Sequence, residues 1–300
     1  MITPPQLQPG DTIGVAAPGR KIPEADLKAA IAILESWGLN VRLAPYLFSQ
    51  KHSYLAGTDA ERLADFQSLI NDADVKAILC ARGGYGSTRI VDQIDFTPLL
   101  AQPKYIIGFS DITALHLKLY GMNIQSIHAT MPILFARESA ASSVESLRRI
   151  LFTKGDILQS RKSDYNRAGI GEGKVIGGNL SLIVDSLGTS SEPDMEGSIL
   201  VIEEIDEYRY KIDRMMMQLQ RAGKLARLNG LVVGYMTDIK DSELGFGETA
   251  EEILLNHVRN YNYPVGFGFP VGHENPNLAW RHGANGKLTV NTHAALTFAD

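Results

Sequence analysis

The chain has 300 residues, of which 44% are hydrophobic and 21% are charged, a composition typical of a globular protein. Its 29 Lys and Arg residues against 34 Asp and Glu residues give a net charge of −5, which argues against nucleic acid as a partner because nucleic-acid-binding proteins are usually basic. The single cysteine, Cys80, excludes an intrachain disulfide framework and a multi-cysteine metal site. The sequence shows no secretory signal and no apolar run near the ~20 residues of a membrane span, so we expect a cytoplasmic protein with no membrane partner.

In the first half of the chain, apolar runs alternate with helical patterns. Strands are expected at residues 12–16, 41–43, 75–80, 105–108 and 124–128. The segments between them repeat apolar residues at helical spacing, and one of them begins with a capping box from Thr58 to Glu61. Continuous apolar strands between amphipathic helices predict an α/β fold in which a parallel sheet is covered on both faces.

Residues 154–173 interrupt this alternation because they are polar and have little periodicity. We interpret them as a linker between a domain of residues 1–153 and a domain of residues 174–300. The second domain is expected to hold strands at 174–176, 199–205, 231–235 and 264–269, helices at 208–222 and 249–260, and a β-hairpin in which Asn285-Gly286 turns between 278–281 and 287–290.

Ser110 stands where a buried strand meets a helix. Gly108 relaxes the backbone after the strand, so the Ser110 hydroxyl would rise above the carboxyl edge of the sheet, where ligands bind in such folds. This arrangement is typical of a nucleophile elbow, although Ile112 replaces the last glycine of the G-x-S-x-G signature. A serine that caps the helix is the alternative interpretation.

The glycine loop, residues 82–86 (Arg-Gly-Gly-Tyr-Gly), follows the neighbouring strand. Its backbone N–H groups could hold a phosphate or an oxyanion, and a tight turn is the simpler explanation. The loop is neither a Walker A loop nor G-x-G-x-x-G, so no nucleotide cofactor is expected.

A serine nucleophile needs a base, and the base needs an acid that orients it. His128 ends an expected strand at the same edge and could line the pocket, and His273 lies in a glycine-rich loop after a later strand. Glu203 and Glu204 end an apolar strand, where alternation sends them to opposite faces. The acids at 203–207 could hold Mg²⁺, but helix-start acids explain them as well, and no metal-binding motif is present, so no metal is expected.

Several motifs stand in a fixed order along the chain: Ile-Gly-Val-Ala-Ala-Pro (13–18), Ala-Arg-Gly-Gly-Tyr-Gly (81–86), Gly-Phe-Ser-Asp-Ile-Thr (108–113), Gly-Gly-Asn-Leu-Ser (177–181), Glu-Glu (203–204) before Tyr-Arg-Tyr-Lys-Ile-Asp-Arg (208–214), and Gly-Phe-Pro-Val-Gly-His (268–273). Together they resemble the LD-carboxypeptidases (muramoyltetrapeptide carboxypeptidases), serine peptidases whose relatives include the microcin C self-immunity peptidases. The resemblance extends over nearly the whole chain.

The resemblance implies a flavodoxin-like N-terminal domain and a smaller, β-rich mixed α/β C-terminal domain, with the active site between them. It implies a metal-free triad in which Ser110 is the nucleophile, His273 the base and Glu203 the orienting acid. The backbone N–H groups of Gly84 and Asp111 would form the oxyanion hole. The implied reaction is release of the terminal D-alanine from murein tetrapeptide in cell-wall recycling, by a homodimer in the cytoplasm and without a cofactor.

Four residues are expected to bind the small peptide substrate: Arg82, Gly83, His128 and Asn179. An exopeptidase must recognise a terminal carboxylate, and Arg82 is our candidate for that role because it precedes the glycine loop. A structural ion pair is the alternative for this arginine.

Two segments depart from the family pattern. Residues 277–283 (Asn-Leu-Ala-Trp-Arg-His-Gly) stand where members that act on murein often carry a Thr-Leu-Pro-Leu-Gly-like run, and Ala129-Thr130 stands where Gly-Pro is common. The substrate therefore stays open between murein tetrapeptide and a peptidyl or aminoacyl adenylate of the microcin C type. A non-catalytic ligand-binding protein and an ordinary α/β-hydrolase esterase are the alternatives from other classes.

Overall fold

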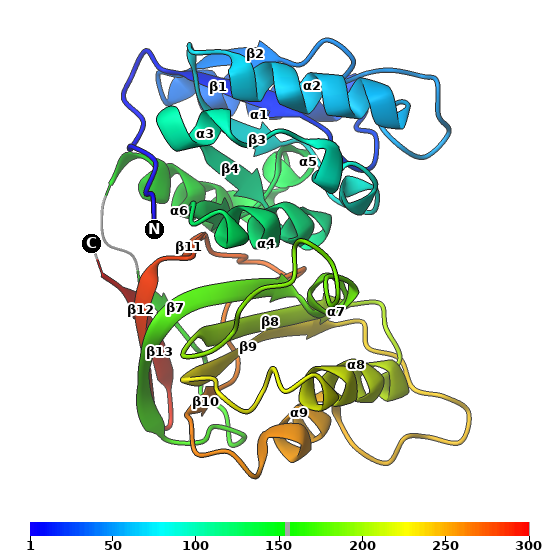
Figure 1. The fold of residues 1–300 in the computed structure, drawn as a ribbon, viewed down its shortest axis with the longest axis vertical. Helices are drawn as coiled ribbons and strands as arrows, with labels where there is room; N and C mark the ends of the chain where they lie inside the picture. The colour runs from blue at the N-terminus through cyan, green and yellow to red at the C-terminus, as the bar shows by residue number, and fades with distance from the viewer. Residues whose placement is uncertain (154–156, 300) are drawn as a thin grey trace.

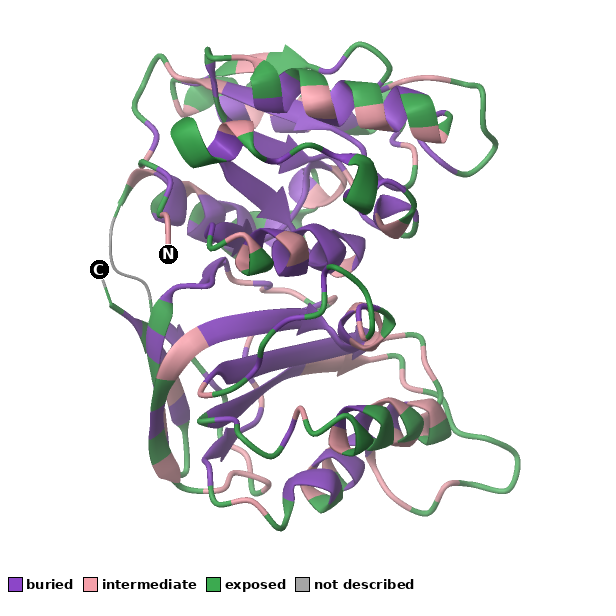
Figure 2. Cartoon of the chain, in the orientation of Figure 1, coloured by how far each residue is buried: buried purple, intermediate pink, exposed green. Residues whose placement is uncertain are grey.

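The computed structural model describes residues 1–153 and 157–299, and Figure 1 shows two units stacked along the long axis of the molecule. Each unit is built on one β-sheet, and helices pack against it. Figure 2 shows that the strands in the middle of both sheets are buried, whereas the outer faces of the helices are exposed. The predicted α/β fold class is confirmed.

The sheet of the N-terminal unit runs in the order β11-β5-β4-β3-β1-β2. Its parallel strands are β1 (Thr12–Ala16), β2 (Asn40–Leu43), β3 (Val75–Cys80), β4 (Tyr105–Gly108) and β5 (Ser126–His128). The order 2-1-3-4-5 is that of flavodoxin-like sheets. At the edge, β11 (Trp280–His282) arrives from the C-terminal part of the chain and pairs antiparallel with β5.

Helices cover both faces of this sheet, because each turns a stripe of apolar residues towards the strands. One face carries α1 (Glu24–Ser36), α5 (Pro132–Phe135) and α6 (Ala141–Phe152), and the other carries α2 (Asp59–Asn71), α3 (Pro98–Ala101) and α4 (Thr113–Gly121). Short 3-10 segments are η1 (Ser87–Arg89), η2 (Val91–Gln93), η3 (Ser110–Ile112) and η4 (Glu138–Ala140). The predicted capping box of Thr58 and Glu61 is present at the start of α2.

The sheet of the C-terminal unit runs in the order β10-β9-β8-β7-β12-β13-β6, with β7 to β10 parallel and the other strands antiparallel. Its strands are β6 (Ile157–Gln159), β7 (Gly169–Asn179), β8 (Ile199–Ile205), β9 (Gly230–Thr237), β10 (Val265–Gly266), β12 (Asn285–Val290) and β13 (Ala294–Phe298). One face packs on α7 (Leu180–Asp185), α8 (Arg209–Arg221) and α9 (Ala250–Val258). The other face packs on Phe269, Val271 and Trp280.

The predicted hairpin around Asn285-Gly286 is wrong. The two residues begin β12, which pairs with β13 and β7, whereas β11 leaves for the N-terminal sheet. The stretch predicted as a linker, residues 154–173, contains β6 and the first part of β7, apart from residues 154–156, which lie outside the described residues. β6 is the edge strand of this sheet, and in β6 and the first part of β7 exposed side chains alternate with less exposed ones, which explains the polar sequence.

Helix α4 joins the two units. Its residue Leu117 packs into the core of the C-terminal unit, and the Thr113 hydroxyl accepts a hydrogen bond of 3.1 Å from the N–H of Asn179 at the end of β7. Because α4 follows Ser110 within one turn, the nucleophile candidate lies at the contact between the units. Within residues 1–153 and 157–299, none of the helices combines the length and apolar character that a membrane span requires.

Candidate active site

Ser110 lies at a sharp turn between β4 and η3. Its backbone φ is +64°, a left-handed conformation that costs a residue with a Cβ about 1–3 kcal/mol. A Cβ on Gly108 would lie only 2.8 Å from Cγ1 of Ile112, so the glycine makes room for the isoleucine. Gly108 therefore leaves room for Ile112, which stands where the signature has its last glycine. The turn still holds Ser110 in the left-handed conformation that is typical of a nucleophile elbow.

The structure brings Ser110, His273 and Glu203 together in one hydrogen-bonded chain. Nε2 of His273 lies 3.0 Å from Oγ of Ser110, and Nδ1 lies 2.6 Å from Oε2 of Glu203. An ionised carboxylate can only accept, so Nδ1–H donates to Glu203 and the Nε2 lone pair accepts from the Ser110 hydroxyl. This tautomer can take a proton from the serine.

Glu203 raises the pKa of His273. Burial lowers the pKa of His273, but the Glu203 carboxylate more than offsets this, and the net pKa is raised above its usual 6.5. Glu203 itself is fully buried, and within the described residues its Oε1 has no hydrogen-bond partner. A Cβ on Gly272 would come within 2.9 Å of Glu203 Oε2, so a glycine is needed for the two segments to approach.

Glu204 points away from His273 and stabilises the start of α7. Its carboxylate accepts from Asn179 Nδ2 at 2.8 Å and from the N–H and Oγ of Ser181 at 2.8 and 2.6 Å. Burial raises the pKa of Glu204. Asn179, expected to bind substrate, therefore has its amide bonded to Glu204 and its Oδ1 bonded to the N–H of Leu182.

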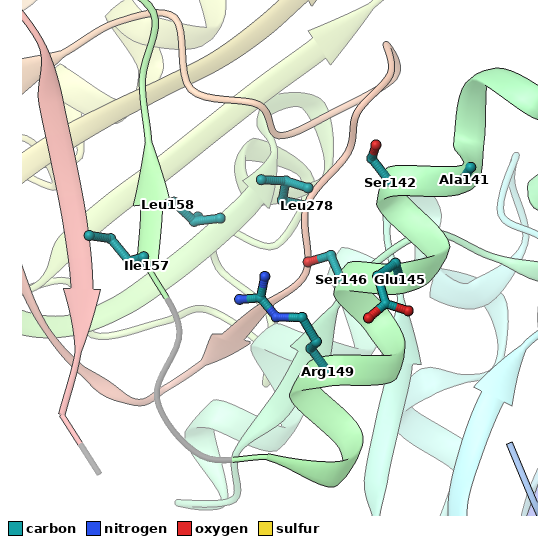
Figure 3. A pocket seen from close by; sticks show the side chains of 8 residues that line it. All are labelled: Ala141, Ser142, Glu145, Ser146, Arg149, Ile157, Leu158 and Leu278. Carbon is teal, nitrogen blue, oxygen red and sulfur yellow. The ribbon is translucent and has the colours of Figure 1, made fainter.

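The segment that carries His273 is tied to the N-terminal unit. The N–H of Asn277 donates to Ser143 Oγ at 2.8 Å, the N–H of Ala279 donates to Ser146 Oγ at 2.9 Å, and β11 then pairs with β5. A pocket of about 430 Å³ lies beside this junction. Figure 3 shows the residues that line it: Ala141, Ser142, Glu145, Ser146, Arg149, Ile157, Leu158 and Leu278. The hydrogen bonds of residues 277–282 to the N-terminal unit keep the His273 imidazole beside Ser110.

The glycine loop lies against the serine turn. A Cβ on Gly83 would lie 3.3 Å from Cβ of Ser110, which shows how closely the two segments approach. The carboxylate of Asp111, whose pKa is raised by burial, accepts from the N–H of Ser87 at 2.9 Å and from its hydroxyl at 2.7 Å. This pair of bonds fixes the loop that contains Gly84 relative to Asp111, the two residues expected to form the oxyanion hole.

A buried arginine supports the glycine loop from its other side. Arg62 Nη1 donates to the carbonyl oxygens of Gly86, at 2.8 Å, and Pro18. Sequence reasoning missed Arg62, because a buried arginine on a helix face leaves no local signal, and it missed Ser87. It also missed Arg20, which follows β1 as Arg82 follows β3, so position after a strand was the signal that could have found it.

Two further residues expected to bind substrate lie in different environments. Arg82 is partly exposed, donates to the Lys21 carbonyl at 3.3 Å, and has a pKa lowered by burial and by the nearby charge of Arg20. His128 is fully buried, and its ring stacks on Trp280 with centroids 5.1 Å apart. Burial lowers the pKa of His128 far below 6.5, so its ring is neutral, and it does not reach the surface.

Phe109 separates the buried His128 from His273. Its ring centroid lies 5.8 Å from that of His128 and 5.0 Å from that of His273. His128 is therefore positioned behind the site, as part of its apolar support. In the described ranges, no group of three or more His, Cys, Asp or Glu side chains is placed to hold a metal ion.

Comparison with known proteins gives a consistent result. Residues 13–129 match the model of the LD-carboxypeptidase N-terminal domain, and residues 172–288 match that of the LD-carboxypeptidase C-terminal domain. A probable murein peptide carboxypeptidase of Bacillus subtilis is 36% identical over 96% of this chain and 91% of its own length. A murein tetrapeptide carboxypeptidase of Pseudomonas aeruginosa is 29% identical over 93% of both chains.

Solved structures agree on the fold. The crystal structure of a muramoyltetrapeptide carboxypeptidase from Oxalobacter formigenes superposes with a TM-score of 0.88 at 28% identity, covering 96% of this chain and 99% of that one. The wild-type apo structure of the microcin C7 self-immunity protein gives a TM-score of 0.88 at 21% identity, over 100% and 99% of the two chains. The second likeness concerns the fold alone.

Proposed function

The chain belongs to the LD-carboxypeptidase family and is a serine-type hydrolase, and on this premise we propose that it releases the terminal D-alanine from murein tetrapeptide. The bond cut would join an L-centre to the D-residue. The observation that carries the proposal is the chain of hydrogen bonds from Ser110 through His273 to Glu203. Relatives named for murein peptides support the choice of substrate.

In the proposed mechanism, Ser110 Oγ attacks the carbonyl carbon of the scissile bond while its proton passes to Nε2 of His273. The carboxylate of Glu203 holds the imidazole in orientation and stabilises the imidazolium. The developing oxyanion accepts hydrogen bonds from the backbone N–H groups of Gly84 and Asp111.

The second half of the reaction uses the same groups. The tetrahedral intermediate collapses as His273 gives its proton to the nitrogen of the leaving D-alanine, which breaks the peptide bond. A water molecule then attacks the acyl-Ser110 ester with His273 as the base. The peptide leaves with a new carboxyl group, and the enzyme returns to its starting protonation state.

Discrimination between a D- and an L-residue follows from the geometry of the leaving group. The two enantiomers direct the side chain and the carboxylate in mirrored directions around Cα, so a site built for one leaves the carboxylate of the other unpaired. A lost charged hydrogen bond costs about 1.5–3 kcal/mol. We therefore expect the D-alanine peptide to be cleaved at least ~10-fold faster than its all-L analogue.

The experiment is mass spectrometry of the purified protein with three compounds: murein tetrapeptide, its all-L analogue and an acyl-sulfamoyl adenylate. Release of D-alanine as the fastest reaction is expected. Equal rates on the two peptides, or hydrolysis of the adenylate alone, would overturn the proposal in favour of the immunity-type activity. Hydrolysis of simple esters without peptide cleavage would indicate an esterase instead.

The family resemblance extends the proposal to assembly and location. We propose a homodimer that acts in the cytoplasm, where recycled murein peptides would reach it. Light scattering is expected to give twice the mass of one chain, and a monomer at working concentration would contradict the dimer. Fractionation of cells that carry the tagged protein tests the location.

A further inference from the structure

Three arginines near the glycine loop have no ion-pair partner within residues 1–153 and 157–299. Arg20 follows β1, Arg82 follows β3 and Arg137 follows α5. Among the described residues, the arginine ion pairs within 4.0 Å involve other arginines, and no carboxylate pairs with these three. Arg20 and Arg137 act on Arg82 as like charges, and Asp26 acts on it by its charge without forming an ion pair. A cluster of positive charges of this kind attracts an anion.

The topology of the sheet places two of these arginines where a ligand is expected. In the order β2-β1-β3-β4-β5, the strands are added on opposite sides of the pair β1 and β3. Open α/β sheets bind ligands in the crevice outside the carboxyl ends of the strands at such a switch point. Arg20 and Arg82 stand on the two sides of this crevice, because they follow β1 and β3.

The side chain of Arg20 covers the glycine loop. Its backbone N–H donates to Gly83 O at 3.2 Å, and a Cβ on Gly84 would lie 3.0 Å from Cβ of Arg20 and 3.4 Å from the hydroxyl of Tyr54. The guanidinium carbon of Arg20 lies 4.9 Å from the centre of the Tyr54 ring. Stacking on a ring face holds a guanidinium in place while its N–H edge stays available to a carboxylate.

A substrate carboxylate bound by Arg20 has to lie close to Ser110. A Cβ on Gly83 would lie 3.3 Å from Cβ of Ser110, and one on Gly84 would lie 3.0 Å from Cβ of Arg20, so consecutive residues of the glycine loop lie against the nucleophile candidate and against the arginine. In a peptide, the terminal carboxyl carbon is two bonds from the nitrogen of the last peptide bond. A group that binds this carboxylate therefore has to stand near the attacking residue, and Arg20 packs on the same glycine loop that lies against Ser110.

We propose that Arg20 and Arg82 bind the terminal carboxylate of the substrate and so make the enzyme an exopeptidase. The inference rests on the proposed function for the identity of the substrate. Arg20 presents the planar, bidentate donor that suits a carboxylate. Arg82 adds a second positive charge from the opposite side of the crevice. Tyr54 keeps the Arg20 guanidinium in its orientation.

The test compares two peptides that differ only at the end: one with a free D-alanine carboxylate and one with a D-alanine amide. The wild-type protein is expected to cleave the free acid at least ~10-fold more efficiently. Arg20→Ala is expected to lower kcat/KM on the acid by about 10- to 100-fold, since a charged hydrogen bond is lost, and to lower it on the amide by less, so that the preference for the acid falls. Arg20→Lys recovers part of the loss, because it keeps the charge.

A matched control is Arg148→Ala, which removes an exposed arginine of α6 that pairs with Glu145. This variant is expected to treat both peptides as the wild type does. A change in acid preference in the control as large as that in Arg20→Ala would overturn the inference, because bulk charge would then explain the effect.

Binding separates this inference from the proposed function. Calorimetry with the Ser110→Ala protein is expected to show the acid bound at least ~10-fold more tightly than the amide, with the difference lost when Arg20→Ala is added. Equal binding of the two peptides would overturn the carboxylate site whatever the turnover. A retained preference in binding, with no cleavage of either peptide by the wild type, would support the site and overturn the proposed reaction.

Discussion

Replacement of Glu203 by glutamine removes one charge and keeps the shape of the side chain. The carboxylate lies 2.6 Å from Nδ1 of His273 and is fully buried. Burial is the largest single influence on the pKa of His273 and lowers it, whereas Glu203 raises it through charge and hydrogen bond, with a smaller rise from Glu204. Without the Glu203 charge, burial outweighs the remaining rise, so we expect the pKa of His273 to fall below 6.5.

The sign of the resulting pH dependence follows from the proposed role of His273 as the general base. His273 can accept a proton only when its imidazole is neutral, so kcat/KM falls as the pH drops through its pKa. In the wild type this acid limb is expected above pH 6.5. In Glu203→Gln the limb moves to lower pH, and the plateau falls by about 10²- to 10⁴-fold because the imidazolium loses its partner.

The assay is D-alanine release measured from about pH 5 to 9, a range that brackets a limb near neutral pH. Glu204→Gln is the control, since this carboxylate bonds Asn179 and Ser181 rather than His273. We expect this change to lower the melting temperature and to move the acid limb less than Glu203→Gln does, because Glu204 raises the pKa of His273 by less than Glu203. A limb at the same pH in Glu203→Gln and the wild type would refute the reasoning, because a group other than His273 would then titrate.

Other changes test the rest of the site. Ser110→Ala is expected to reduce D-alanine release by ~10³-fold or more with an unchanged melting temperature, and a folded, fully active variant would refute the nucleophile. Ser87→Ala removes the hydroxyl that donates to Asp111 at 2.7 Å, and we expect a lower kcat with little change in KM, since the proposed oxyanion donors of Gly84 and Asp111 would shift; a rise in KM alone would contradict this. EDTA is expected to leave activity unchanged, and loss restored by zinc would require a metal.

The elements that the sequence predicts best are the buried parallel strands. The expected bounds of β3, β4 and β8 agree with the structure residue by residue, because both faces of these strands are covered and the apolar runs are continuous. The separation of Glu203 and Glu204 also follows from the alternation of side chains in a strand. In the structure, these two carboxylates bond different partners on opposite sides of β8.

Long-range pairing was beyond the reach of local patterns. The Asn-Gly pair at 285–286 and its flanks match a hairpin, yet β11 pairs with β5 in the other unit. Nothing near Trp280 in the sequence distinguishes these partners, because the choice depends on an open edge more than a hundred residues away. The position of Arg20 after β1 could be read from the sequence, but its closeness to Arg82 depends on the pairing of β1 with β3.

Strand β11, which the C-terminal part of the chain contributes to the N-terminal sheet, explains how Ser110 and His273 from two units stay within hydrogen-bond distance. Trp280 in β11 pairs with His128 in β5, and His128 pairs with Gly108 in β4, so one row of the sheet lies just before Ser110 and just after the His273 segment. A slip of one residue would move β11 by about 3.3 Å. A shift of that size would take His273 out of hydrogen-bond distance of Ser110. It would also turn the buried Trp280 ring to the opposite face. The burial of Trp280 therefore fixes the register on which the Ser110–His273 distance depends.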